Sequence, residues 1–119
     1  RRCGNLIEMI NDSGVTPICC GTDMNELTPN SVEAATEKHI PVVEIDGNIA
    51  RVTVGSTLHP MEEAHYIEWI YLETSIGIKR VKLNPKEEPI ASFALLEEET
   101  VVAAYAYCNL HGLWIKELK

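Results

Sequence analysis

All four histidines of this 119-residue chain lie in three short stretches, one of which also carries a cysteine. Imidazole nitrogen and thiolate sulfur are donors that transition metals bind in proteins. The stretches can therefore serve one metal centre if the fold brings them together. They are residues 37–39, with His39; residues 59–65, with His59 and His65; and residues 108–111, with Cys108 and His111.

Taken singly, each stretch is a weak indication of a metal. A Cys-x-x-His pair such as Cys108 and His111 is at least as often a buried cysteine beside a surface histidine. His59 and His65 are six residues apart, so they do not share one face of a regular helix. Together with His39, however, they supply five donors, and a structural zinc site closes at about four. Five mixed nitrogen and sulfur donors favour a redox metal such as iron with one open position.

From residue 28 onward, most of the chain is predicted to form β-strands. Short segments rich in β-branched and aromatic residues alternate with turn signals, and Asp46-Gly47-Asn48 is typical of a hairpin. Strands at this spacing predict an antiparallel sandwich, which gathers the loops of one end into a single patch. A short helical turn is expected over residues 31–37, capped by Asn30 or Ser31. The predicted strands cover residues 42–45, 50–54, 66–73, 78–83, 90–96, 101–107 and 113–117.

Residues 1–27 have a different character and hold the other three cysteines, Cys3, Cys19 and Cys20. A segment this short cannot bury enough surface to hold itself together, so a covalent or metal staple is expected. Adjacent cysteines are poorly placed to bridge each other, and no secretion signal indicates an oxidising compartment. Metal binding by thiolates is therefore the preferred interpretation.

The charge balance and the hydropathy exclude other classes. A formal net charge of -8 argues against nucleic-acid binding, which needs clustered Lys and Arg. No apolar run approaches the ~18 residues of a membrane span, and no signal peptide is recognisable. We therefore expect a cytoplasmic protein. Because the chain begins with Arg1-Arg2, an upstream segment is also expected.

The three histidine stretches and their neighbours resemble the superoxide reductase family, which includes desulfoferrodoxin and neelaredoxin. The resemblance spans essentially the whole chain and rests on EKHIPV (37–42), GSTLHPMEEAHYIEWI (55–70) and YCNLHGLW (107–114), in that order. It implies an all-β fold, an immunoglobulin-like seven-stranded antiparallel β-sandwich with a small N-terminal desulforedoxin-like cysteine domain. The boundaries would be 1–27 for that domain and 28–119 for the catalytic domain.

The same resemblance implies an enzyme that reduces superoxide to hydrogen peroxide at one non-haem iron with an open sixth position. Lys38 matches the family lysine that attracts the superoxide anion beside this position. Glu37 matches the carboxylate that takes the position once the iron is ferric. The implied ligands are His39, His59, His65 and His111 in the equatorial plane, with Cys108 as the axial thiolate.

Partners and a second metal also follow from the resemblance. The reaction uses one electron per superoxide, which implies an external donor such as a rubredoxin-like protein, and a homodimer is expected. Cys3, Cys19 and Cys20 match three of the four ligands of a tetrahedral iron site, and the fourth would lie upstream of Arg1. Iron, zinc or no metal at that site all remain open.

An alternative from another class is a binding module whose sandwich displays a surface and whose histidines hold a structural zinc. A closed tetrahedral zinc would leave one of the five donors unbound. The number of bound donors therefore distinguishes the two hypotheses.

Overall fold

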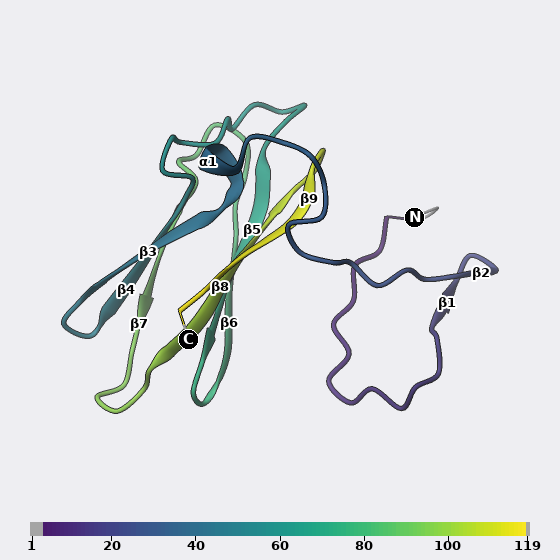
Figure 1. The fold of residues 1–119 in the computed structure, drawn as a ribbon, viewed down its shortest axis with the longest axis horizontal. Helices are drawn as coiled ribbons and strands as arrows, with labels where there is room; N and C mark the ends of the chain where they lie inside the picture. Colours follow the sequence, from purple (N-terminus) through teal and green to yellow (C-terminus); the bar gives the residue numbers. More distant parts are fainter. Residues whose placement is uncertain (1–3, 119) are drawn as a thin grey trace.

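The structure, a computed structural model, describes residues 4–118. Its main body is a sandwich of two antiparallel sheets, one with the strand order β3-β4-β7 and the other with β6-β5-β8-β9 (Figure 1). This confirms the seven-stranded sandwich expected from the sequence. The strands are β3 (Pro41–Asp46), β4 (Ile49–Val54), β5 (Ile67–Thr74), β6 (Gly77–Lys82), β7 (Ile90–Ala94), β8 (Val101–Cys108) and β9 (Gly112–Glu117).

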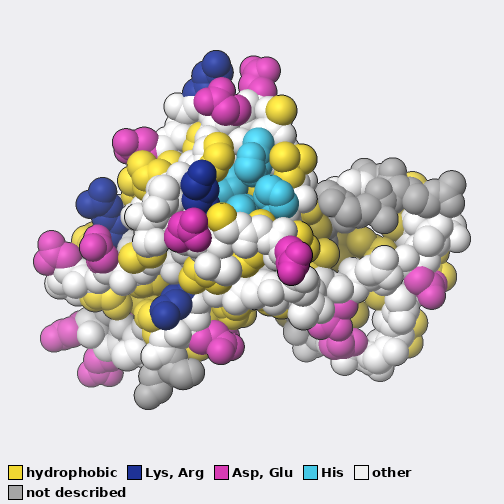
Figure 2. All heavy atoms as spheres, turned by 45° about the horizontal axis from the view of Figure 1, so that its top comes forward, with side chains coloured by type: hydrophobic (Ala, Val, Ile, Leu, Met, Phe, Trp, Pro, Cys, Tyr) yellow, Lys and Arg dark blue, Asp and Glu magenta, His cyan; other side chains and the backbone are white. Residues whose placement is uncertain are grey.

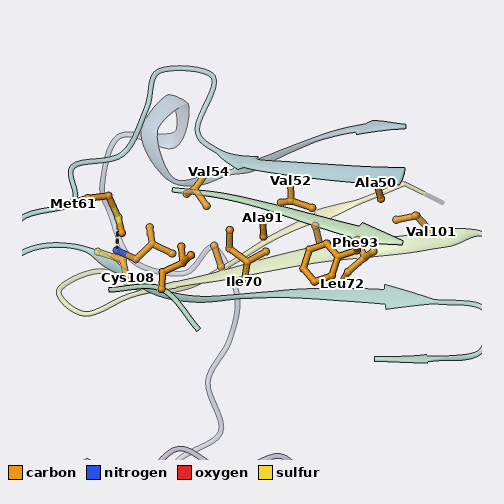
Figure 3. Packing of buried hydrophobic residues seen from close by; sticks show 14 of the residues in the cluster. Ala50, Val52, Val54, Met61, Ile70, Leu72, Ala91, Phe93, Val101 and Cys108 are labelled. Carbon is orange, nitrogen blue, oxygen red and sulfur yellow. Dashed lines mark hydrogen bonds between the residues drawn. The ribbon is translucent and has the colours of Figure 1, made fainter. Parts of the chain in front are cut away.

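The core lies between the two sheets and follows from alternation along the strands. In β4, Ala50, Val52 and Val54 are fully buried, while Arg51 between them is exposed, because successive side chains of a strand point to opposite faces. Burying an aliphatic side chain of this kind contributes about 1.5–3 kcal/mol. The cluster runs from Ala50 at one end to Met61 and Cys108 at the other (Figure 3). Cys108 therefore closes the apolar core.

Two tight turns connect neighbouring strands of the sandwich. The first is the hairpin that the sequence predicts, and the second carries two of the predicted metal donors. Asp46 pairs with Ile49, so the expected hairpin closes between β3 and β4 with Gly47 at a φ of 62°. Cys108 pairs with Gly112, which has a φ of 81°. The β8–β9 turn therefore begins at the cysteine and contains His111, so both donors of the Cys-x-x-His pair come from one hairpin.

The predicted helical turn was placed too early. Helix α1 covers Thr36–His39, and its N-cap, Ala35, makes no side-chain capping bond. Asn30 has a φ of 60° and fastens the preceding segment to β9 instead. Its Oδ1 accepts from the Ile115 backbone N–H at 2.9 Å, and its Nδ2 donates to the Ile115 carbonyl at 3.3 Å. An asparagine amide can pair with backbone in this way, which competes with helix capping.

Residues 4–27 contain little regular structure and lie beside the sandwich (Figure 1). A hairpin of two-residue strands, β1 (Ile18–Cys19) and β2 (Thr22–Asp23), surrounds the cysteine pair. Ile10 and Val15 are 85% and 71% exposed, as expected for a segment too short to build its own core. The Tyr71 hydroxyl donates to Glu8 at 3.0 Å and so joins this segment to β5. A domain boundary after residue 27 remains a proposal.

The opposite end of the sandwich holds a buried carboxylate. Glu99 is 7% exposed and accepts hydrogen bonds from the Thr74 hydroxyl, the Leu96 backbone N–H and the Lys79 ammonium. These bonds hold the pKa of Glu99 below its ordinary value, and the bond from Thr74 contributes most.

Within residues 4–118, no helix has the length and apolar character needed to cross a membrane.

Candidate metal centre

The predicted donors lie on three segments at one end of the sandwich, here called the loop end. It consists of α1, the β4–β5 connection (residues 55–66) and the β8–β9 turn. His39 is the last residue of α1, His59 and His65 belong to the connection, and Cys108 and His111 belong to the turn. Histidine side chains from these segments gather at one place on the surface, bordered by hydrophobic and basic side chains (Figure 2).

The four imidazoles form a four-sided ring. Neighbouring centroids are 4.6 Å apart for His39–His59, 4.7 Å for His59–His65, 5.2 Å for His65–His111 and 5.0 Å for His39–His111. Neighbouring planes are close to perpendicular, at 77–85°. Across the ring, His39 and His65 are 6.5 Å apart. Opposite imidazoles that bind one ion through bonds of about 2.1 Å have centroids roughly 6.5 Å apart, so the ring has the dimensions of a four-nitrogen plane.

Hydrogen bonds assign the proton on two of these rings. The Nδ1 atoms of His39 and His59 donate to the carbonyls of Ala35 and Pro60, each at 2.7 Å. In the neutral ring, Nε2 then carries a lone pair, and these two Nε2 atoms face each other at 3.2 Å. Two lone pairs at this distance repel unless a cation lies between them. Among the described residues, the buried Nε2 atom of His65 also has no hydrogen-bond partner. Buried polar atoms are normally paired, so this nitrogen is free to bind a metal ion.

Cys108 completes the donor set from the core side. Its side chain is fully buried, and its Sγ lies 3.8 Å from His111 Nδ1. Burial raises the pKa of the Cys108 thiol, while the backbone N–H groups of Leu110 and His111 oppose this rise. A bound cation would favour the thiolate. The donor atoms of His39, His65, Cys108 and His111 all lie within 4.8 Å of one another, and His59 adjoins this group through its 3.2 Å contact with His39.

The loop end is held together by a glycine that sequence reasoning did not single out. Gly55 has a φ of 90°, and a Cβ there would lie 2.3 Å from the Thr57 carbonyl oxygen and 2.8 Å from that of Glu37. This close approach lets the Thr57 N–H donate to the Glu37 carbonyl at 2.9 Å. The turn that carries His39 is thereby fastened to the segment that carries His59.

The buried Trp114 of β9 contacts the ring directly. Its indole lies on His39, with centroids 4.7 Å apart, and its Nε1–H donates to the His111 carbonyl at 3.1 Å. One buried side chain of β9 therefore orients two of the predicted ligands.

Glu37 and Lys38 are both exposed at the rim of the ring. Burial lowers the pKa values of His39 and His65, and the charge of Lys38 lowers both further. Lys38 directly precedes His39 in α1, so it belongs to the same segment as one predicted ligand.

The proposed N-terminal metal site stays a prediction. Cys3 lies outside the described residues. The Cys19 sulfur accepts a hydrogen bond from Asn5 Nδ2 at 3.5 Å, while Cys20 is exposed with a φ of 55°. The two side chains thus differ in surroundings although they are adjacent in the chain.

The fold and the loop end define an immunoglobulin-like β-sandwich with a histidine and cysteine centre fit for one transition metal. The sequence model of the desulfoferrodoxin family matches residues 31–117. A desulfoferrodoxin homolog of Archaeoglobus fulgidus is 43% identical over 94% of this chain and 88% of its own length. The superoxide reductase of Treponema pallidum has a similar structure, with a TM-score of 0.84, 40% identity and coverage of 92% of this chain and 91% of its own. The chain belongs to the desulfoferrodoxin family.

We predict that Gly55→Ala lowers the free energy of unfolding by more than about 2 kcal/mol, because it adds a left-handed penalty to a backbone clash. Urea denaturation measures the change. Gly77→Ala is the matched control, since a Cβ at Gly77 meets nothing within 4 Å. Equal effects of the two substitutions would show that the approach at Gly55 is not needed.

We predict that His59 of the metal-free protein is neutral at pH 7 and carries its proton on Nδ1, because burial lowers its pKa to about 4. An unfolded chain takes up this proton near its ordinary pKa of 6.5, so the metal-free fold loses stability as the pH falls from 6.5 towards 4. Nitrogen-15 NMR of the imidazoles reports tautomer and pKa together. An Nε2–H tautomer titrating near 6.5 would contradict the assignment.

Proposed function

We propose that this protein is a superoxide reductase that uses one iron ion held by the four histidines and Cys108. The observation that carries the proposal is the four-sided imidazole ring closed from the core side by a buried thiol. Five donors exceed what a closed tetrahedral zinc needs. Membership of the desulfoferrodoxin family and the similarity to a structure named superoxide reductase support the same conclusion.

Ferrous iron, when bound, supplies the single electron that superoxide accepts. Superoxide, one electron and two protons together give one hydrogen peroxide, so no oxygen is released. The neutral imidazoles add no charge to the centre, while the Cys108 thiolate would donate electron density to a bound metal, as thiolate ligands do in haem enzymes. The side chains at the rim of the ring would attract the substrate and control its approach to the metal.

Lys38 is proposed to draw the substrate to the centre. The chain carries a net charge of -8, so its overall field repels an anion such as superoxide. An exposed ammonium beside His39 and His65 reverses this field locally and stabilises negative charge on the bound substrate. Glu37, its neighbour, is proposed as the carboxylate that covers the open position in the oxidised state.

The cycle needs an external one-electron donor, for which we propose a rubredoxin-like protein. We also propose that the N-terminal segment pairs two copies of the chain, since apolar side chains there, such as Ile10 and Val15, are exposed. A cytoplasmic location and a second iron or zinc at the N-terminal cysteines complete the proposal.

The first test is metal analysis with visible absorption of the protein before and after oxidation by ferricyanide. We expect about one iron per loop-end site and a thiolate-to-iron band on oxidation, because the Cys108 thiolate would be one of the metal ligands. Cys108→Ser should abolish the band and leave the metal weakly held. A colourless zinc protein with one dispensable histidine would instead establish a structural site.

The second test is superoxide consumption by the iron-loaded Lys38→Ala variant. We expect the second-order rate to fall about 10-fold or more at low ionic strength, because electrostatic focusing changes rates by this order. Lys116→Ala, which removes an exposed charge from β9 where it pairs with Ala104, should leave the rate unchanged. One peroxide per superoxide at the expense of a reductant is expected, whereas oxygen evolution would indicate dismutation.

A further inference from the structure

Asn109, between the two donors of the β8–β9 turn, makes its bonds to the neighbouring loop rather than to the donors. Its Oδ1 accepts from the Tyr66 backbone N–H at 2.9 Å, and its Nδ2 donates to the Ala64 carbonyl at 3.1 Å. Its own backbone N–H donates to the Tyr66 carbonyl at 3.1 Å. Three hydrogen bonds from one residue thus bracket His65, which lies between Ala64 and Tyr66.

His65 differs from His39 and His59 in how its ring is held. His39 and His59 are each oriented by a carbonyl that accepts from Nδ1. Hydrogen bonds of this kind normally set the orientation of a metal-binding imidazole. Within the described chain, the buried Nε2 of His65 has no partner, and no carbonyl holds its Nδ1.

The loop that carries His65 has few other ties to the scaffold. Glu62 and His65 exchange two backbone hydrogen bonds, at 2.9 and 3.0 Å, but these are internal to the loop. At its two ends, the Met61 carbonyl accepts from Lys86 N–H at 2.7 Å, and Ile67 N–H donates to the Met61 sulfur. Residues 62–64 are exposed. Ile67 pairs with Cys108 where β5 begins, and between this pair and Met61 the position of His65 relative to Cys108 depends on Asn109.

We propose that Asn109 is the positioning residue of His65 and takes the part that backbone carbonyls play for His39 and His59. The role needs an amide, because one side chain must both accept from Tyr66 and donate to Ala64. A consequence is that loss of the Asn109 side chain frees His65 before His39 and His59, whose rings carbonyls still hold. The inference rests on the proposed ligand set, but its test does not depend on superoxide chemistry.

The test compares Asn109→Asp with Asn30→Asp. Both replace an amide that joins a backbone N–H to a backbone carbonyl by an isostere lacking the donor, but Asn30 bonds to Ile115 of β9 and brackets no ligand. Metal transfer from iron-loaded protein to an excess of a ferrous chelator gives the release rate. Amide hydrogen exchange of Tyr66 in the metal-free protein gives a readout without any metal.

We expect Asn109→Asp to speed metal release about 10-fold or more, the usual effect of losing a group that orients a ligand. We also expect faster Tyr66 exchange, because the carboxylate that replaces the Nδ2 donor repels the Ala64 carbonyl and displaces the loop, although it keeps an acceptor for the Tyr66 N–H. Asn30→Asp should lower the thermal midpoint without changing either rate. Should Asn109→Asp fail to fold, Asn109→Ser replaces it with the same expectation. Equal release rates for the two variants, or unchanged Tyr66 exchange, would overturn the proposal.

The two proposals fail separately. Zinc in place of iron, or no reaction with superoxide, would refute the proposed function, whereas faster Tyr66 exchange in Asn109→Asp would still support the positioning role. Conversely, if the protein is an active reductase but Asn109→Asp releases iron at the wild-type rate, the proposed function is supported and the positioning role of Asn109 is refuted.

Discussion

The loop end brings imidazole nitrogens and a thiol close together. Without a proton or a cation between them, the nitrogen lone pairs repel one another. With Nδ1 of His39 and His59 committed to carbonyls, their Nε2 atoms meet at 3.2 Å with no proton between them. Burial further disfavours protonated imidazoles, since a charge removed from water is costly. A metal cation resolves this conflict, and an arrangement that is unfavourable when empty becomes a strong binding site when filled.

The packing of the sandwich holds these donors close together. Its core ends at Cys108, so the sulfur is placed by the same packing that stabilises the two sheets (Figure 3). Gly55 lets the turn before β3 lie against the end of β4, and Trp114 orients His39 from the side of β9. Core packing and Trp114 thus join Cys108 and His39 to strands, while Gly55 joins the His39 turn to the connection that follows β4. The precision of the ring thus comes from the rigidity of the sheets.

Charge is arranged on two scales. The chain as a whole carries a net negative charge, and its overall field repels anions such as superoxide. At the loop end, the exposed Lys38 directly precedes His39, and a local cation can outweigh a distant negative field because salt screens charges beyond about 8–10 Å.

The sequence by itself determined the strands, because alternation of apolar side chains depends only on neighbours along the chain, and the family, because three motifs recur in order. It also identified the donors by type, which is a property of single residues. The ring geometry, the tautomers of His39 and His59, and the buried, unpartnered Nε2 of His65 were decided only by the tertiary structure. The same holds for Asn30, expected as a helix cap but bound to Ile115, and for Asn109 between two predicted ligands. Their partners lie 85 and 43–45 residues away, and a side chain's choice between local and distant backbone is made by the packing that brings the distant one near.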